Sequence, residues 1–254
     1  MIGFNYRRIP AFALAKDLIS GGRLGAVRHV RVACVQDWLA DESGAMDVRL
    51  GNESAGSGVL GDIACHAIDL IQHLTGQSAA EVTGVRRTSA MQWPGTTGLE
   101  DVLVDDAMWA TLGLTGGIGA SIEVSSVTGS EQKSLRIEAY GSRGLVAFDL
   151  ENPNELSFLD AAVPTNEQGS PRVLVAEPDS QCLDTWWSQG QVIGREQTFT
   201  PQVGHFLLAI NSGEASRRPS FEEAQQVQRV LAAIQESSAN KSKITPVQLP
   251  AQAS

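Results

Sequence analysis

Asp62 and His66 lie four residues apart in an otherwise apolar segment, and this pair is the most chemically informative feature of the sequence. In a helix, positions i and i+4 share one face, so the carboxylate and the imidazole would be neighbours. An imidazole titrates near neutral pH, and an adjacent carboxylate can orient it and raise its basicity. The spacing therefore predicts an acid/base pair. The residues alone leave open a purely structural, hydrogen-bonded pair inside a helix.

Asp69 and His73 continue the same helical face at positions i+7 and i+11. They are either passengers of the predicted pair or part of a metal site, because carboxylate and imidazole at helical spacing can ligate zinc. Only His205 offers a third ligand, so we predict no metal site. Cys65 points about 100° away from His66 around the helix and is interpreted as a buried small residue, not a nucleophile.

The composition describes an ordinary globular chain of 254 residues, with 42% hydrophobic and 19% charged residues. The formal net charge of -10 argues against a phosphate-backbone partner, so we predict no nucleic acid. No apolar run approaches the roughly 20 residues that cross a bilayer, so we predict no membrane contact. Three widely spaced cysteines, Cys34, Cys65 and Cys182, indicate neither a disulfide framework nor a zinc knuckle and favour a reducing cytoplasm.

Helices are predicted towards both ends of the chain. Pro10 and the pair Gly21-Gly22 bracket a helix over about residues 10 to 20, and the segment carrying His66 is predicted to be helical up to Leu74, where Gly76 ends it. Two further helices are expected near 201–212 and from Ser220, where Ser220 and Glu223 form a capping box.

Short runs rich in β-formers predict strands in the middle of the chain. They cover residues 26–36, 81–87, 106–114, 117–126, 135–141 and 144–150, with hairpin turns at 115–117 and 141–144 and a short possible strand after Lys241. This order predicts an α+β fold, a large open, mostly antiparallel sheet with helices packed on one face. The other face also needs cover, so we predict a homo-oligomer formed through the sheet.

Residues 56–61 spell Gly-x-Gly-x-x-Gly, and Glu81 lies 20 residues beyond the last glycine. A dinucleotide-binding signature of this kind requires a strand directly before the first glycine. The nearest predicted strand ends well before this point, so we interpret the glycines as a flexible helix entry. They would still let backbone N–H groups approach a ligand oxygen beside Asp62.

The segment 55–70, together with residues 3–11, resembles the Gfo/Idh/MocA oxidoreductases. The resemblance rests on Gly-Asp-x-x-x-His-x-x-Asp in its glycine-rich setting, and extends to the tripeptides Gln36-Asp37-Trp38 and Val104-Asp105-Asp106. It runs from residue 3 to about residue 240 and is weakest between 160 and 200. A bare Asp-x-x-x-His would not be specific, but this longer motif is.

The resemblance implies an NAD(P)-dependent dehydrogenase for a sugar or cyclitol hydroxyl. His66 would be the catalytic acid/base, and Asp62 would hold the substrate hydroxyl or the histidine. Asn5 would lie near the nicotinamide as a cofactor-binding residue. The predicted substrate-binding residues are Tyr6, Arg7, Gln36, Trp38 and Arg49. Core packing is an open alternative for the tryptophan, and a surface ion pair is one for each arginine.

The sequence departs from the family in one large respect. Relatives carry a Rossmann domain and a Glu-Lys-Pro segment before the point that corresponds to Met1, and none of the four lysines of this chain stands in such a context. We therefore predict that the N-terminal Rossmann domain is absent, that residues 1–8 are a remnant of its last strand and linker, and that residues 9–254 form the substrate domain.

These assignments predict that NAD or NADP serves the complete enzyme and is not bound by this chain alone. The rival interpretation is a non-catalytic module for carbohydrate binding or oligomerisation. The identity of the sugar or cyclitol and the choice between NAD and NADP stay open, because the determinants of cofactor preference would lie upstream.

Overall fold

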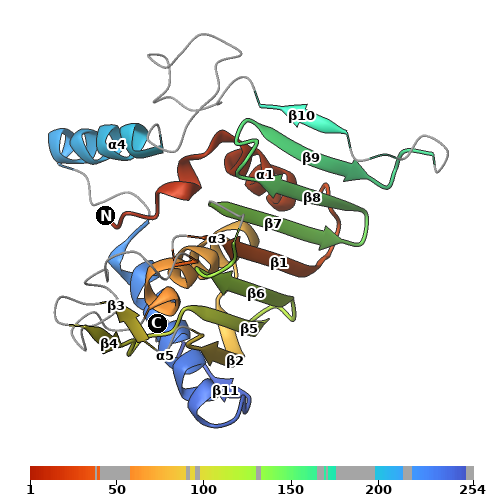
Figure 1. The fold of residues 1–254 in the computed structure, drawn as a ribbon. Coiled ribbons are helices and arrows are strands. Elements are labelled where there is room, and N and C mark those ends of the chain that lie inside the picture. The colour runs from red at the N-terminus through yellow and green to blue at the C-terminus, as the bar shows by residue number, and fades with distance from the viewer. Residues whose placement is uncertain are drawn as a thin grey trace.

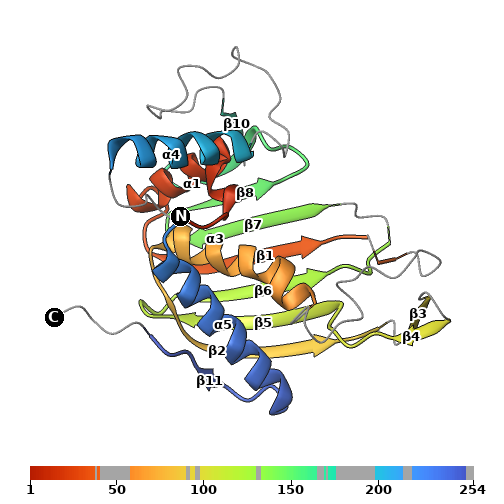
Figure 2. The same ribbon diagram turned by 90° about the vertical axis from the view of Figure 1, so that its left-hand side faces the viewer.

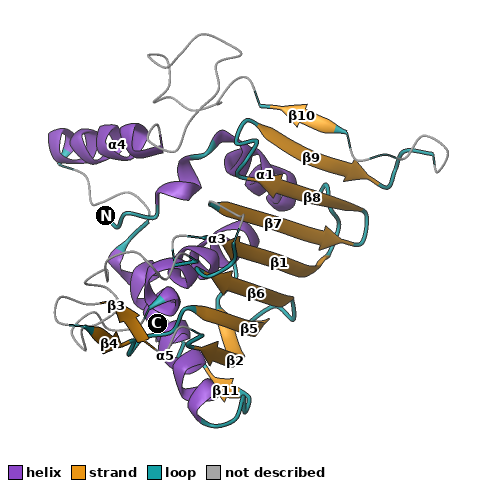
Figure 3. Cartoon of the chain, viewed as in Figure 1, coloured by secondary structure: helices purple, strands orange, loops and turns teal. Residues whose placement is uncertain are grey.

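The computed structural model describes residues 1–37, 39–40, 58–89, 92–94, 98–129, 133–164, 169, 171–175, 198–213 and 219–249. Within these residues a nine-stranded open sheet carries a layer of helices on one face (Figures 1 and 2). Figure 3 separates the two layers by colour. The architecture is α+β, as predicted.

The strands of the large sheet come from almost the whole length of the chain. They are β1 Val27–Val35, β2 Ala79–Arg87, β5 Ala107–Leu114, β6 Gly119–Ser125, β7 Ser134–Gly141, β8 Gly144–Asp149, β9 Glu155–Asp160, β10 Arg172–Leu174 and β11 Thr245–Pro246. Their order across the sheet is β10-β9-β8-β7-β1-β6-β5-β2-β11. The β1–β6 pair is parallel and the other pairs are antiparallel. A separate hairpin joins β3 Gln92–Pro94 to β4 Leu99–Asp101.

The helical elements begin and end at residues suited to those positions. They are the 3-10 turn η1 Asn5–Arg8, α1 Pro10–Ser20, the π-helical turn η3 Leu60–Ala64 leading into α3 Cys65–Thr75, α4 Phe199–Ser212 and α5 Phe221–Ala239. Pro10 is at the first position of α1, and Gly76 ends α3 with φ 69°, a left-handed conformation that suits glycine. At the start of α5, Ser220 and Glu223 form the predicted capping box.

The hydrophobic core lies between the sheet and the helices α1, α3 and α5. Along β5, Met108, Ala110 and Leu112 are buried beneath the helices, whereas Trp109 and Thr111 alternate with them on the bare face. From α1, the fully buried ring of Phe12 packs on Phe148 of β8, with ring centroids 4.4 Å apart. One continuous core therefore holds the helical layer against the sheet.

The predicted helices and the strands from 26 to 150 are confirmed, with differences at their ends. The short strands β9 and β10 were not predicted, because their half-exposed residues lack a clear alternation. The parallel pairing of β1 with β6 was not predicted either, since buried alternation looks the same for both strand directions.

The first four residues form no strand in this structure, and η1 follows them directly. The division at residue 8 stays a prediction. Among the described helices, none combines the length and the apolarity needed to span a membrane.

Candidate functional site

His66 lies in the first turn of α3, where two aromatic rings from the N-terminal segment surround it. The Phe4 and Tyr6 rings meet the imidazole edge-on, with centroids at 5.8 and 5.1 Å and interplanar angles of 79° and 70°. The imidazole is half-buried and its Nδ1 atom is buried. Of the two ring nitrogens, Nδ1 faces the protein interior. In both ribbon views the N-terminal segment runs alongside α3 (Figures 1 and 2).

Asp62 lies in the π-helical turn η3, not in the α-helix that the spacing predicts. Its side chain is exposed, its backbone N–H donates to the Gly58 carbonyl at 3.1 Å, and its own carbonyl accepts from the Cys65 thiol at 3.5 Å. A π-turn is wider than an α-turn, so the angular offset between Asp62 and His66 differs from the α-helical expectation. Such turns are frequent at functional sites.

Arg7 ties three elements together at the base of this site. Its guanidinium donates two parallel hydrogen bonds to the Asp69 carboxylate of α3, with Nε at 2.8 Å from Oδ2. Its Nη1 donates to Glu223 Oε1 of α5 at 2.8 Å. The Arg7 and Asp69 side chains are only 6% and 2% exposed. Asp69 is therefore no passenger, because it anchors the residue that follows Tyr6 to the same helix that carries His66.

Burial and pairing act against each other in this ion pair. Burial lowers the pKa of Arg7, but contacts with Asp69 and Glu223 outweigh burial and raise the pKa above its ordinary value, so the guanidinium stays charged. Burial raises the pKa of Asp69 to about 6, although Arg7 opposes the shift. The charged pair is thus the form present at neutral pH.

One turn further along α3, His73 lies in a different environment. Burial lowers the pKa of its imidazole to about 4, and the charges of Arg7 and Lys16 act in the same direction. His73 is therefore neutral at physiological pH. In the described part of the chain, no group of three His, Cys, Asp or Glu side chains is arranged to hold a metal ion.

Asp105 anchors the start of the helical segment that carries Asp62 and His66. Its carbonyl accepts from Val59 N at 3.0 Å, and its carboxylate Oδ2 accepts from Leu60 N at 2.8 Å. The other carboxylate oxygen pairs with Arg86 at 3.1 Å. An acidic group at a helix N-terminus stabilises it through the helix dipole.

The same contact explains one glycine of the Gly-x-Gly-x-x-Gly sequence. A Cβ at Gly58 would lie 1.9 Å from the Asp105 carbonyl oxygen, so the chain's own backbone requires glycine there. Two backbone N–H groups at this helix start already have Asp105 as acceptor. The described residues therefore do not fit a dinucleotide phosphate cradle. Gly56 and Ser57 lie outside the described residues.

The remaining predicted site residues differ in their surroundings. Asn5 is buried and its Nδ2 donates to Thr198 Oγ1 at 2.7 Å. Tyr6 is half-buried beside His66, and Gln36 is half-buried at the end of β1, where its backbone N–H donates to Ser125 O at 2.8 Å. Trp38 and Arg49 lie outside the described residues. The structure thus brings Tyr6 to His66, and the cofactor and substrate roles stay predictions.

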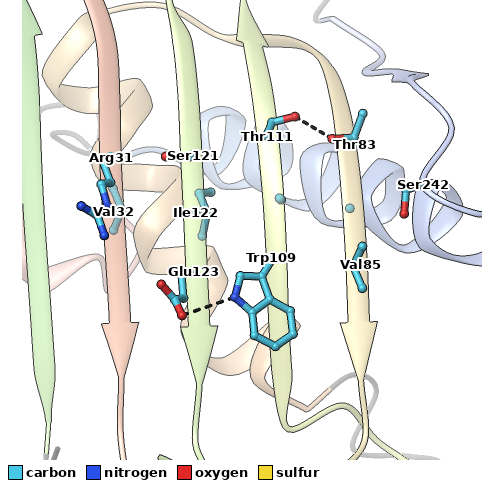
Figure 4. Close-up of a pocket in the computed structure, with 12 residues that line it drawn as sticks. Arg31, Val32, Thr83, Val85, Trp109, Thr111, Ser121, Ile122, Glu123 and Ser242 are labelled. Atoms are coloured by element: carbon cyan, nitrogen blue, oxygen red, sulfur yellow. Dashed lines mark hydrogen bonds between the residues drawn. The ribbon is translucent and has the colours of Figure 1, made fainter.

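A hollow of about 350 Å³ lies on the bare face of the sheet, with the helices behind it (Figure 4). Arg31, Thr83, Trp109, Thr111, Ser121 and Glu123 are among its lining residues. The indole of Trp109 donates to Glu123 at 3.3 Å, and the hydroxyls of Thr83 and Thr111 share a hydrogen bond of 2.6 Å. Because His66 lies in the helical layer, this hollow is not part of the acid/base site.

Comparison with known proteins identifies the class of the fold. Residues 12–147, more than half of the chain, match the family model of the GFO/IDH/MocA C-terminal domain. The chain belongs to the Gfo/Idh/MocA family.

Individual family members align over nearly the whole chain. Levoglucosan dehydrogenase of Pseudarthrobacter phenanthrenivorans is 31% identical over 265 residues, which cover 99% of this chain and 67% of that protein. The crystal structure of an oxidoreductase domain protein from Kribbella flavida is 40% identical with a TM-score of 0.92, covering 98% of this chain and 66% of that one.

Levoglucosan dehydrogenase in complex with NADH and levoglucosan gives 32% identity and a TM-score of 0.91, with 98% of this chain and 66% of that chain covered. The chain therefore spans about two thirds of the length of these family relatives.

Two contacts that hold the candidate site together were missed by sequence reasoning. The Arg7–Asp69 pair joins residues 62 positions apart, and the Asp105 anchor joins residues 45 positions apart. Both acids stand in motifs that carry the family resemblance, Gly-Asp-x-x-x-His-x-x-Asp and Val-Asp-Asp. An acidic residue embedded in a buried apolar run was the available signal, because such a group needs a partner.

We expect Gly58→Ala to destabilise the start of η3. The new Cβ would displace the Asp105 carbonyl and break the hydrogen bonds that hold Val59 and Leu60, at a cost of about 1–3 kcal/mol. The control is Gly129→Ala, since a Cβ at Gly129 would meet open space. The free energies of unfolding of both variants would be measured by urea denaturation. Equal stabilities would contradict the anchoring role of Asp105.

The neutral state of His73 predicts a pH dependence of stability. Its pKa in the folded chain, about 4, lies below the ordinary value of 6.5, so the unfolded chain is protonated first as the pH falls. The stabilisation that the folded chain gains from a neutral His73 is complete above pH 6.5. As the pH falls from 6.5 to 4, the free energy of unfolding decreases by up to about 1.4 kcal/mol per pH unit.

Asp69 acts in the opposite direction over part of the same range, because its pKa is raised from 3.8 to about 6. Wild type is therefore compared with His73→Gln at each pH, which leaves Asp69 in both proteins. We expect the stability difference to shrink from pH 6.5 to pH 4. A difference that stays constant over this range would rule out a neutral, buried His73.

Proposed function

We propose that this chain is the substrate-binding and catalytic-residue domain of an NAD(P)-dependent dehydrogenase that oxidises a sugar or cyclitol hydroxyl. The observation that carries the proposal is the imidazole of His66, held edge-on by Phe4 and Tyr6 at the start of α3 in a family that includes levoglucosan dehydrogenase. A half-buried histidine placed there suits proton transfer at neutral pH.

In the proposed reaction, His66 removes the proton of the substrate hydroxyl at Nε2. The exposed Asp62 carboxylate holds the same hydroxyl or stabilises the protonated imidazole. The chemistry supplied by a bound nicotinamide is acceptance of the hydride from the alcohol carbon. We assign Tyr6, Gln36, Trp38 and Arg49 to the substrate and Asn5 to the nicotinamide end of the site, as the family resemblance implies. Arg7, which is paired with Asp69 and Glu223, would serve substrate binding by fixing the segment that carries Tyr6.

We further propose that this chain alone binds neither NAD nor NADP and is inactive by itself. The support is the start of η3, where Gly58 is packed against Asp105 and the N–H groups of Val59 and Leu60 are already occupied. A separate nucleotide-binding domain would therefore hold the cofactor. Residues 1–8 would be the linker to it, and residues 9–254 the substrate domain. Free thiols at Cys34 and Cys65 are in keeping with a cytoplasmic enzyme.

The bare sheet face supports our proposal of a homo-oligomer. Trp109 is 42% exposed at the hollow on this face, beside cross-strand pairs of opposite charge such as Arg31 and Glu138. An interface between two copies of this chain would bury the indole in a symmetric contact, with these ion pairs beside it.

The catalytic role of His66 predicts a large loss of turnover in His66→Ala. The test uses this chain joined behind the segment of levoglucosan dehydrogenase that it does not match, with levoglucosan and NAD as substrates. We expect kcat to fall by about 10²–10⁴-fold, because proton removal loses its base. His29→Ala in β1 is the matched control and keeps its activity. Near-normal turnover of His66→Ala would reject the assignment.

The proposed interface predicts a change of mass in solution. Trp109→Arg places a charge at the centre of the bare face, so we expect the oligomer to dissociate, as measured by light scattering during gel filtration. Leu103→Arg, an exposed position outside the face, serves as the control. A wild-type chain that is monomeric at all concentrations would refute the sheet-face interface.

A further inference from the structure

Two consecutive acids, Asp105 and Asp106, lie where neighbouring strands of the sheet begin and end. Asp106 directly precedes β5, Arg87 ends β2 and Ser125 ends β6, and these three strands lie side by side (Figure 2). The two acids are only 4% and 1% exposed. Because buried acids need polar partners, their contacts show which segments this dipeptide holds in place.

The side chain of Asp106 fixes its own backbone to the segment that follows β2. Its carboxylate accepts from the backbone N–H of Ser89 and from the Ser89 hydroxyl, the latter at 3.2 Å. The Asp106 N–H donates to the Arg87 carbonyl at 2.9 Å. These bonds set the position of the two carbonyl groups of the dipeptide.

The two carbonyl groups accept from two different parts of the fold. The Asp105 carbonyl accepts from Val59 N, at the turn that leads into η3. The Asp106 carbonyl accepts from the backbone N–H and the hydroxyl of Ser126, at 3.0 and 3.1 Å, just beyond β6. A displacement of the dipeptide would therefore move both segments.

Ser126 connects this anchor to the end of β1. Leu39 N donates to the Ser126 carbonyl at 2.9 Å, and Gln36 N donates to the adjoining Ser125 carbonyl at 2.8 Å. The Gln36 carbonyl in turn accepts from Thr128 N at 3.2 Å. The two residues that flank positions 37 and 38 in the sequence are thus both tied to the end of β6.

We propose that Asp106 is a positioning residue for substrate binding, which holds the end of β1, with Gln36, in register with η3, which carries Asp62. The inference rests on the proposed function, in which Gln36 and Trp38 bind the substrate and Asp62 holds its hydroxyl. Asp106 acts through its neighbours, since its carbonyl holds Ser126 and its peptide bond joins it to Asp105. The motifs Gln-Asp-Trp and Val-Asp-Asp are then two parts of one structural unit.

Hydrogen exchange in this chain tests the link between the two segments. In Asp106→Ala the Ser89 N–H loses its acceptor and the dipeptide loosens. We expect the amides of Gln36 and Leu39, and those of Val59 and Leu60, to exchange about tenfold faster or more. Faster exchange in one of the two segments alone, or in neither, would overturn the proposal.

Two further variants show whether the Ser89 contacts are the cause. Asp106→Asn retains slow exchange, because its amide can accept from the Ser89 N–H and donate to the hydroxyl. Ser89→Ala removes one of the two bonds, so it gives the pattern of Asp106→Ala at smaller amplitude and decides the matter if Asp106→Ala does not fold. An Asp106→Asn variant that exchanges as fast as Asp106→Ala would count against these contacts.

Asp149→Ala is the matched control. Asp149 likewise accepts from a backbone N–H of a turn, that of Glu151 at 3.0 Å, but it ends β8. We expect this variant to leave exchange in both segments as in the wild type. Accelerated exchange there would mean that the effect of Asp106→Ala is a general loss of stability, and the proposal would be wrong.

Kinetics distinguish positioning from a purely structural role. In the fusion with the segment of levoglucosan dehydrogenase that this chain does not match, we expect Asp106→Ala to raise KM for levoglucosan about tenfold and to leave KM for NAD unchanged. Gln36→Ala alone raises KM for levoglucosan to a similar degree, and the double variant raises it little further, because both changes remove the same contact. Independent effects that multiply to about a hundredfold, or an equal rise of both KM values, would reject the positioning role.

The two measurements separate this inference from the proposed function. Linked exchange of the two segments without turnover by the wild-type fusion supports the link and rejects the function. Turnover by the fusion with unlinked exchange rejects the link and supports the function.

Discussion

The buried contact of Arg7 with Asp69 and Glu223 is the constraint on which the site depends. It joins η1, α3 and α5, whose partner residues lie 62 and 216 positions from Arg7 in the chain. Removing one partner of a buried pair leaves an uncompensated charge and typically costs about 3–5 kcal/mol. Tyr6 directly precedes Arg7 in η1, and His66 lies one helical turn before Asp69 in α3. The Arg7–Asp69 ion pair and the Tyr6–His66 ring contact therefore join the same two elements.

Glu223 extends this constraint to the last helix. One of its carboxylate oxygens accepts from Arg7 and the other from the backbone N–H of Ser220, so a single side chain caps α5 and binds η1.

The polar face of α3 carries charge unevenly. At neutral pH, Asp69 is an anion paired with Arg7. His73, one turn later, is uncharged because burial and the nearby cations Arg7 and Lys16 lower its pKa. Environment, not residue type, therefore assigns the role of each member of this face.

Local signals account for most of the predicted elements. Pro10, Gly76 and the pair Ser220 and Glu223 mark helix ends through contacts within a few residues, which a sequence displays directly. The α+β architecture follows from the alternating strands in mid-chain. The π-turn at Asp62 was not predictable from α-helical spacing. The anchoring of Val59 and Leu60 was not predictable either, since it depends on the carbonyl and the carboxylate of the distant Asp105. The sequence identified Asp62 and His66 as candidate residues. The angle between their side chains around the helix could be known only from the structure.

The position of β1 in the sheet has a consequence for how this protein is made. β1 pairs with β6 on one edge and with β7 on the other, so Val32 lies opposite Ile122 and Ile137. Both partners are synthesised long after β1, and contacts of such separation form slowly. A nascent chain therefore presents two unpaired edges of a valine-rich strand until residues 119–141 have emerged. During that interval β1, which later lies among the central strands of the sheet, can aggregate with other chains or bind a chaperone.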